Sequence, residues 1–188
     1  MDKHIFKKNT ALTKEESNNC IKYFESHKNI KEDKSRGYSL IFGSLRSNEF
    51  NFLKNILITN IDEYVKQHSF LGTLHCPWTM EEYFNIQKYY PGNYYGGEHM
   101  EHGQYDHNSK KLLAWMFYLN DIKEGGGTGF DRLDEYEKEV VIKPQMGRMV
   151  VFNNVNDDGS LNLKSRHAGL PVIKGEKWAF NLWLRERE

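Results

Sequence analysis

The sequence predicts a mainly β protein with helices near its N-terminus, and the architecture we expect is a double-stranded β-helix, a form of jelly roll. Two observations support this prediction. Short apolar and aromatic runs separated by Gly, Asn and Asp fill the chain after about residue 80, which is typical of strands and turns. No helical pattern interrupts these runs, so a sandwich or barrel is favoured over a sheet built from strand–helix–strand units.

Two helices are expected within the first third of the chain. Thr13 and Glu16 have the spacing of a capping box, in which each side chain accepts the backbone amide of the other residue. Residues at helical spacing follow, so a helix is predicted over about 14–27. Apolar residues also recur every three or four positions from Phe50 onwards, which predicts an amphipathic helix over about 48–68. We expect both helices to cover one face of the larger sheet.

The predicted strands follow from alternation and from turn signals. They are residues 82–90, 95–101, 112–119, 138–142, 148–152, 166–173 and 176–185. Glycines 125–127 and residues 156–159 mark turns. The last strand has a mixed face, formed by Lys177, Ala179, Asn181 and Trp183, and an apolar face, formed by Trp178, Phe180, Leu182 and Leu184. We expect the apolar face to pack on the helices and the mixed face to line a cavity.

Length and composition predict one folded domain over residues 1–188, with helical support in about 1–75 and the β-helix core in about 80–188. Apolar residues make up 38% of the chain and aromatic residues 14%, which argues against a disordered protein. Residues 1–12 and 28–37 are rich in charge, and we expect them to be loosely held or solvated.

Charge and cysteine content restrict the partners and the compartment. The 26 basic and 26 acidic residues balance without a basic stripe, so we expect no nucleic-acid partner. Cys20 and Cys76 cannot form a disulfide framework, and they suit a reducing compartment. The sequence shows neither a signal-like apolar region at its start nor an apolar run of membrane length. A cytoplasmic protein without a membrane partner is expected, and these patterns predict no oligomeric state.

The chemistry is expected in the stretch 96–102, whose centre is His99-Met100-Glu101. His99 and Glu101 are two positions apart on a predicted strand, so their side chains project from the same face. A non-haem Fe(II) site uses two histidines and one carboxylate, and His167 can supply the distant third ligand. We therefore predict that His99, Glu101 and His167 bind the metal and form the catalytic centre.

Other polar residues near this stretch leave further roles open. His102 offers a second ligand register, and His102, Asp106 and His107 are candidates for substrate contact. An exposed polar loop is the favoured interpretation of Asp106 and His107. His75 and Cys76 have the form of half a zinc site, but a structural role is favoured because the sequence contains no second pair.

Several blocks of the sequence resemble, in order, those of Fe(II)- and 2-oxoglutarate-dependent dioxygenases of the prolyl 4-hydroxylase-like group. The blocks are residues 89–92, 99–101, 118–121, 125–130, 144–147, 152–153 and 167–183. The resemblance covers over half of the chain, and it implies an enzyme that uses Fe(II), 2-oxoglutarate and O₂ and releases succinate and CO₂. It also implies L-ascorbate as a reductant. The leading substrate is a prolyl residue in a peptide or protein, with free amino acids and other small molecules left open.

The same resemblance assigns residues to the cosubstrate. Lys177 lies ten residues after His167, and it is expected to bind the 5-carboxylate of 2-oxoglutarate. Tyr89 is expected to donate a hydrogen bond to this cosubstrate, and Trp183 to pack along it. Periodicity agrees for two of these residues, because Tyr89 and Lys177 fall on the mixed faces of their predicted strands.

The chain departs from the family pattern at two positions. The carboxylate ligand of the family is usually Asp, whereas this chain has Glu101, which is one methylene longer. A Thr that contacts 2-oxoglutarate in the family is replaced by Ala114. A basic residue that some members use for substrate would fall near Lys111. Thr128, in the glycine-rich loop, is expected to shape a turn.

Two functions of other classes stay open from the residues alone. The first is a cupin-like protein that binds a metal or a small ligand without turnover. The second is a hydroxylase of nucleic acid or of another non-peptide substrate, and the balanced charge argues against nucleic acid.

Overall fold

One large antiparallel sheet forms the centre of the structure, a computed structural model that describes residues 4–34, 37–67, 77–95, 97–102, 111–130 and 140–187. Its strand order is β1-β10-β6-β13-β5-β3-β2, and β4 pairs with β13 outside this path. The bounds are Ile5–Lys8 for β1, Lys31–Asp33 for β2, Tyr38–Ser44 for β3, Trp78–Met80 for β4, Tyr83–Tyr89 for β5, Lys111–Tyr118 for β6, Met149–Asn153 for β10 and Lys177–Glu186 for β13.

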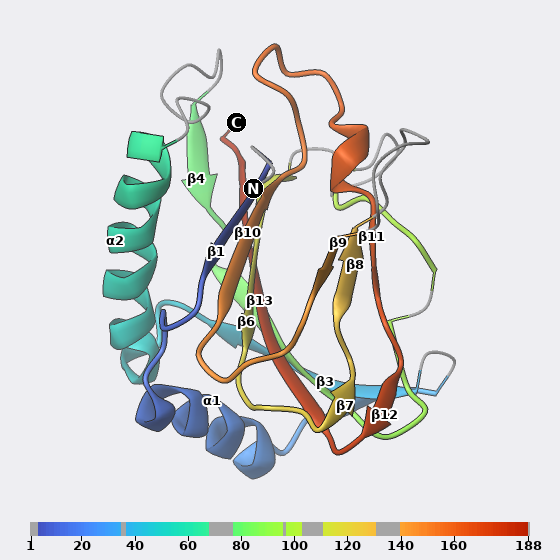
Figure 1. The fold of residues 1–188 in the computed structure, drawn as a ribbon. Helices are drawn as coiled ribbons and strands as arrows, with labels where there is room; N and C mark the ends of the chain where they lie inside the picture. The colour runs from blue at the N-terminus through green and yellow to red at the C-terminus, as the bar shows by residue number, and fades with distance from the viewer. Residues whose placement is uncertain are drawn as a thin grey trace.

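Two small sheets face the large one and complete a second layer (Figure 1). The first has the order β11-β8-β9 and the second pairs β12 with β7. Their strands are Glu124–Gly125 (β7), Thr128–Phe130 (β8), Val140–Ile142 (β9), His167–Gly169 (β11) and Val172–Lys174 (β12). Two facing layers of antiparallel strands, with both α-helices of the described residues in the N-terminal part of the chain, confirm the predicted double-stranded β-helix.

Both predicted helices are present. The first, α1, spans Lys14–Ser26, and the second, α2, spans Asn51–Gln67 after a 3₁₀ turn over Asn48–Phe50; a further 3₁₀ turn spans Leu163–Ser165. The capping box at the start of α1 is confirmed. The Glu16 amide donates to Thr13 Oγ1 at 3.2 Å, and the Thr13 amide donates to Glu16 Oε2 at 2.7 Å.

The helices cover one face of the large sheet, as predicted (Figure 1). The apolar face of β13 is fully covered there, and the Phe24 ring of α1 meets Trp178 edge-on at 4.9 Å between ring centroids. Leu57 of α2 is completely buried in the same cluster. Burying a leucine side chain stabilises a fold by about 1.5–3 kcal/mol, so this layer holds the sheet whose other face lines the site.

The N-terminal segment corrects two expectations. Residues 1–12 are not all loosely held, because β1 pairs with β10 and both Ile5 and Phe6 are buried. Within 28–37, residues 31–33 form β2, which pairs with β3. Neighbouring charged residues dominate the composition of both segments and conceal these short strands. The N-terminal part therefore adds strands as well as helical support.

Two strand predictions need correction, and β3, β4, β7 and β8 were not predicted. The sequence did not predict β3, whose Gly43 lies opposite Phe84 and leaves room for that ring: a Cβ at Gly43 would approach Phe84 Cζ to 2.2 Å. Glycine inside an apolar run weakens a strand signal. Over 95–101, His99 forms an isolated bridge rather than a strand. The strand predicted over 166–173 is divided into β11 and β12 near Pro171, which has no amide to donate.

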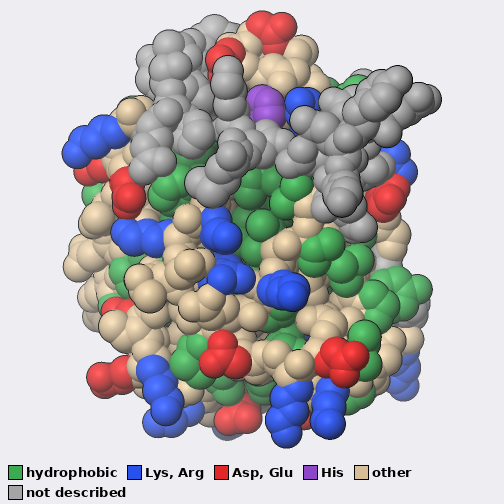
Figure 2. Space-filling view, viewed as in Figure 1, with side chains coloured by type: hydrophobic (Ala, Val, Ile, Leu, Met, Phe, Trp, Pro, Cys, Tyr) green, Lys and Arg blue, Asp and Glu red, His purple; other side chains and the backbone are tan. Residues whose placement is uncertain are grey.

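Other features of the molecule bear on its surroundings. In Figure 2, acidic and basic side chains are mixed over the lower part of the face shown. None of the helices in the described ranges is both long and apolar enough to cross a bilayer. Cys20 is a buried free thiol. Cys76, like His75, lies outside the described residues.

Candidate metal centre

The structure brings His99 and His167 together through their backbones. The two residues form an antiparallel bridge. The amide of each donates to the carbonyl of the other at 3.0 Å. Their imidazole rings lie 4.3 Å apart between centroids. The pairing of two chain segments thus fixes the spacing of two predicted ligands.

Both imidazoles present the same nitrogen to the site. His167 Nδ1 lies 2.8 Å from the carbonyl of Ser165, and His99 Nδ1 lies 3.3 Å from that of Gly97. A carbonyl only accepts, so Nδ1 is the protonated nitrogen in each contact and Nε2 keeps its lone pair. Burial, together with nearby His99, lowers the pKa of His167 to about 4. A neutral imidazole is the form that binds a metal.

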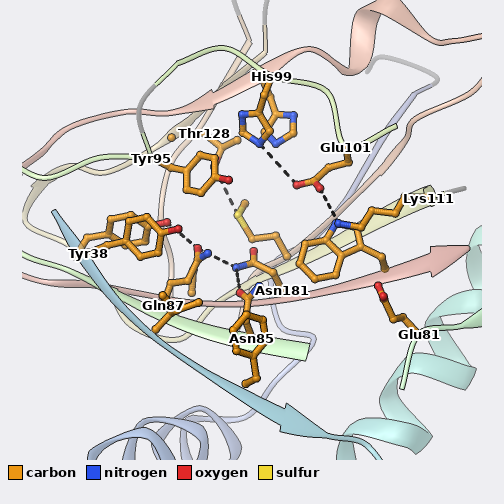
Figure 3. A pocket seen from close by; sticks show the side chains of 18 of the residues that line it. Tyr38, Glu81, Asn85, Gln87, Tyr95, His99, Glu101, Lys111, Thr128 and Asn181 are labelled. Atoms are coloured by element: carbon orange, nitrogen blue, oxygen red, sulfur yellow. Dashed lines mark hydrogen bonds and ion pairs between the residues drawn. The ribbon is translucent and has the colours of Figure 1, made fainter. Parts of the chain in front are cut away.

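Glu101 completes the cluster. One ligand atom each from His99, Glu101 and His167 all lie within 4.8 Å of one another. Burial raises the pKa of Glu101, but the contacts with His99 and Lys111 outweigh it and lower this pKa to about 2. The carboxylate is therefore ionised at neutral pH. Figure 3 shows His99 and Glu101 projecting into one pocket. Two imidazoles and one carboxylate fit the donor set that non-haem Fe(II) prefers.

A cavity of about 470 Å³ extends from this cluster over the inner face of the large sheet. Its walls include the mixed faces that the sequence predicted on β5 and β13. The lining residues from these two strands are Tyr83, Asn85, Gln87, Tyr89, Lys177, Ala179, Asn181 and Trp183. This volume falls within the usual range of about 300–1,000 Å³ for small-molecule sites.

Lys177 places a buried cation in the cavity wall. The residue is only 4% exposed, and burial lowers its pKa to about 8. In the part of the chain that the structure describes, no carboxylate lies within ion-pair distance of its Nζ atom. The rings of Tyr89 and Tyr118 flank the ammonium, with centroids at 5.2 and 5.4 Å. A buried charge without a counter-ion is costly, and an anionic ligand would satisfy it.

An amide cluster that the sequence did not single out forms the cavity floor. Gln87 Oε1 accepts from the Tyr89 hydroxyl at 2.6 Å and from Asn181 Nδ2 at 3.1 Å. The same Asn181 nitrogen also donates to Asn85 Oδ1 at 2.9 Å (Figure 3). The alternation of polar residues on β5 and β13 was the signal for these side chains. Their hydrogen bonds appear only when the strands are paired in register.

Thr128 was expected to shape a turn, but it lies in a strand. It begins β8 and lines the cavity. Its hydroxyl lies 2.7 Å from the hydroxyl of Tyr118, which also donates to the Ile142 carbonyl. Gly126, two residues earlier, has a φ of 67°, and a Cβ there would meet Lys177 Cδ at 3.6 Å and Ile122 Cδ1 at 2.8 Å. The glycine-rich loop thus closes over the base of Lys177.

Trp183 lies toward the end of the cavity that is opposite to Lys177. Six positions separate it from Lys177 on β13, which is roughly 20 Å along a strand. The Lys111 ammonium stands over its ring at 3.7 Å from the centroid, and Lys111 also contacts Glu101 at 3.2 Å. The predicted contact of Trp183 with the cosubstrate stays a prediction. Sequence reasoning noted Lys111 only for a role in substrate binding.

The neighbouring polar residues do not join the ligand cluster. His102 Nδ1 lies 3.2 Å from the Lys111 carbonyl. The Glu98 carboxylate forms an ion pair with Arg166. Asp106 and His107 lie outside the described residues.

The chain is similar in sequence to a known enzyme superfamily and to curated prolyl 4-hydroxylases. The model of the 2OG-Fe(II) oxygenase superfamily matches residues 84–185. Probable prolyl 4-hydroxylase 10 of Arabidopsis thaliana is 28% identical over 94% of this chain and 67% of the relative. Prolyl 4-hydroxylase 13 of the same plant is 32% identical over 56% of this chain and 43% of the relative. The match thus spans less than half of one relative and about two thirds of the other.

Solved structures share the fold. A viral collagen prolyl hydroxylase from Paramecium bursaria Chlorella virus-1, solved as a 2OG complex, aligns with a TM-score of 0.74 at 24% identity, covering 98% of this chain and 97% of that one. A prolyl hydroxylase from Trichoplax adhaerens, in complex with a hypoxia-inducible-factor peptide fragment, aligns with a TM-score of 0.69 at 17% identity, covering 98% and 84% of the two chains. At these identities the likeness concerns the fold.

Proposed function

The chain belongs to the 2OG-Fe(II) oxygenase superfamily, and from this premise we propose that it is a 2-oxoglutarate-dependent dioxygenase that hydroxylates a prolyl residue of a peptide or protein. One observation carries the proposal. A cluster of two imidazoles and one ionised carboxylate opens into the same cavity as Lys177, a buried cation that no carboxylate of the described residues pairs with. This pairing suits a metal and a dicarboxylate bound side by side.

His99, Glu101 and His167 are the proposed Fe(II) ligands. When bound, Fe(II) supplies the oxidising chemistry: O₂ is reduced while 2-oxoglutarate is oxidised and decarboxylated to succinate and CO₂, and one oxygen atom enters a substrate C–H bond. The protein holds and orients the reacting groups. The Nδ1–H bonds to the Ser165 and Gly97 carbonyls keep both rings in the tautomer that exposes Nε2.

Lys177 and Tyr89 are the proposed partners of 2-oxoglutarate. The Lys177 ammonium is a buried point charge that can pair with the 5-carboxylate. The Tyr89 hydroxyl lies in the same wall, donates to Gln87 Oε1, and can turn toward the cosubstrate. We propose that Trp183 bounds the site at its other end, and that L-ascorbate serves as the reductant.

Two features support a prolyl substrate. The curated relatives carry the name prolyl 4-hydroxylase, and one structural neighbour holds a peptide fragment. In addition, Phe42 and Tyr83 line the cavity and remain about half exposed. An apolar ring such as that of proline, with flanking peptide, suits such a mouth, because exposed aromatic residues favour apolar partners.

The direct test is a product search. The protein is incubated with Fe(II), 2-oxoglutarate, O₂ and ascorbate in the presence of proline-containing peptides, matched proline-free peptides and free amino acids. We expect succinate in proportion to product, and a mass increase of one oxygen atom in the proline-containing peptides. The His167→Ala variant should form neither product. Fe(II) binding without any 2-oxoglutarate consumption would instead favour a cupin-like binding protein, and oxidation confined to free amino acids would overturn the peptide assignment.

A further inference from the structure

We propose that Lys111 is a positioning residue that holds the Glu101 carboxylate in the orientation for metal binding, an inference that rests on the proposed function. The two oxygens of Glu101 face different partners. Oε1 lies 3.7 Å from His99 Nε2, within the ligand cluster, whereas Oε2 lies 3.2 Å from Lys111 Nζ. Figure 3 shows the Glu101 carboxylate between the two side chains. This arrangement assigns Oε1 to the metal and Oε2 to Lys111.

Lys111 is itself held in place. Its Nζ atom lies 3.7 Å from the centroid of the Trp183 ring, within the range of a cation–π contact. The side chains of Lys111 and Glu101 are only 12% and 18% exposed. Solvent therefore screens their attraction much less than it screens a surface ion pair. Among the described carboxylates, that of Glu101 is the one within ion-pair distance of Lys111.

Glu101 needs such a restraint because its backbone does not provide one. His99 is bridged to His167, but Glu101 follows in a bend outside any strand. Its side chain also has one more rotatable bond than the aspartate that the family pattern has at this position. An ammonium hydrogen-bonded to the second oxygen removes this freedom. Partners of this kind, which hydrogen-bond a metal ligand, typically change metal affinity by about 10–100-fold.

The test measures metal binding rather than turnover. Fe(II) is titrated anaerobically into wild type and Lys111→Met, and the heat of binding gives Kd. We expect Lys111→Met to weaken Fe(II) binding by roughly tenfold or more. Lys88→Met is a matched control. Lys88 Nζ also lies 3.2 Å from a glutamate, Glu176, and over a tryptophan ring, Trp178, at 4.8 Å. Since that group stands outside the cavity lining, its loss should leave Fe(II) affinity unchanged.

A double-mutant cycle then tests the contact itself. The Glu101→Asp carboxylate is one methylene shorter, so we expect it to bind Fe(II) without reaching Lys111. In that background, Lys111→Met should change the Kd by less than about twofold, giving clear coupling between the two positions. An Fe(II) affinity of Lys111→Met within about twofold of wild type, or an equal loss in both backgrounds, would overturn the inference.

Two further controls keep the outcomes distinct. Circular dichroism checks that each variant is folded, and Lys111→Gln replaces Lys111→Met if the latter is not. If wild type and His167→Ala bind Fe(II) equally weakly, the proposed function fails. If wild type binds Fe(II) through His167 but removal of the Lys111 charge has no effect, only the role of Lys111 fails.

Discussion

His99 and His167 exchange both backbone hydrogen bonds of one antiparallel bridge, each at 3.0 Å, although they lie far apart in the sequence. The bridge brings their rings within 4.3 Å of each other. Phe152 and Phe130 pack against His167, with centroids at 4.7 and 5.6 Å. The candidate metal centre is therefore built on backbone pairing and aromatic packing, before any metal contributes.

The first prediction is that the ion pair beside this backbone bridge contributes little to stability or to metal binding. Glu98 and Arg166 flank the two histidines, and their side chains are 45% and 42% exposed. Exposed ion pairs contribute about 0–1 kcal/mol. Glu98→Ala should therefore lower the free energy of unfolding by less than about 1 kcal/mol and leave Fe(II) affinity unchanged, as measured by thermal melts and calorimetry. A tenfold weaker Fe(II) affinity would mark Glu98 as a ligand.

The second prediction concerns the 2-oxoglutarate charge partner. Lys177→Ala should weaken 2-oxoglutarate binding while leaving Fe(II) binding intact, because truncating one partner of a buried charge pair costs about 2–5 kcal/mol. The measurement is the Kd of 2-oxoglutarate for the metal-loaded protein. Lys174→Ala, at an exposed position of β12, is the control. Wild-type affinity in Lys177→Ala would remove Lys177 from the site.

The third prediction is a pH dependence at the same residue. Burial lowers the pKa of Lys177 from 10.5 to about 8, so the ligand-free protein progressively loses this charge above pH 8. The 2-oxoglutarate dianion needs the protonated form. Its affinity should therefore be greatest below about pH 8 and fall above it by up to about tenfold per pH unit. Lys177→Met should lose this dependence, and a wild-type affinity that is constant between pH 7 and 9.5 would contradict the shift.

The lowered pKa of Lys177 also predicts how the stability of the fold depends on pH. Between pH 8 and 10.5, the unfolded chain carries a proton on Lys177 that the ligand-free folded chain has lost. The contribution of Lys177 to the free energy of unfolding therefore rises with pH through this window. Bound 2-oxoglutarate should reduce that rise, because the paired ammonium keeps its proton.

Local patterns predicted much of this arrangement. Capping and apolar spacing indicated α1 and α2, and alternation indicated which faces of β5 and β13 line the cavity. These are properties of a few consecutive residues. The prediction that His99 and Glu101 point the same way assumed a strand, whereas His99 lies in an isolated bridge. The two side chains still meet, with His99 Nε2 3.7 Å from Glu101 Oε1.

Properties that depend on pairing could not be read from the sequence. Lys111 lies on β6 and Trp183 on β13, and the Lys111 ammonium stands over the Trp183 ring because these strands are neighbours. The Asn181 hydrogen bonds to Asn85 and Gln87 likewise depend on the register between β5 and β13. A single sequence contains no signal for the register in which distant strands pair.

The fourth prediction assigns α2 a supporting role. Leu57 is completely buried between the helix and the large sheet. Leu57→Ala should lower the free energy of unfolding by roughly 2–5 kcal/mol, because it deletes apolar contacts and leaves a cavity. Activity per folded molecule should stay near wild type, since Leu57 is on the sheet face opposite the site. Ile58→Ala, at an exposed position of the same helix, should change the melting temperature little. Equal melts for both variants would contradict the packing.

The last prediction tests Glu101, where the chain differs from its family pattern. Glu101→Ala removes the one carboxylate of the described cluster, so Fe(II) binding should weaken sharply and 2-oxoglutarate-coupled hydroxylation should be abolished. Glu101→Asp should retain measurable activity, because aspartate can still supply one oxygen to the metal. Its Fe(II) affinity should be below that of wild type, because the shorter side chain loses the 3.2 Å contact with Lys111. An iron-loaded, fully active Glu101→Ala protein would exclude Glu101 as a ligand, and Asp106→Ala would then be the next variant to titrate with Fe(II).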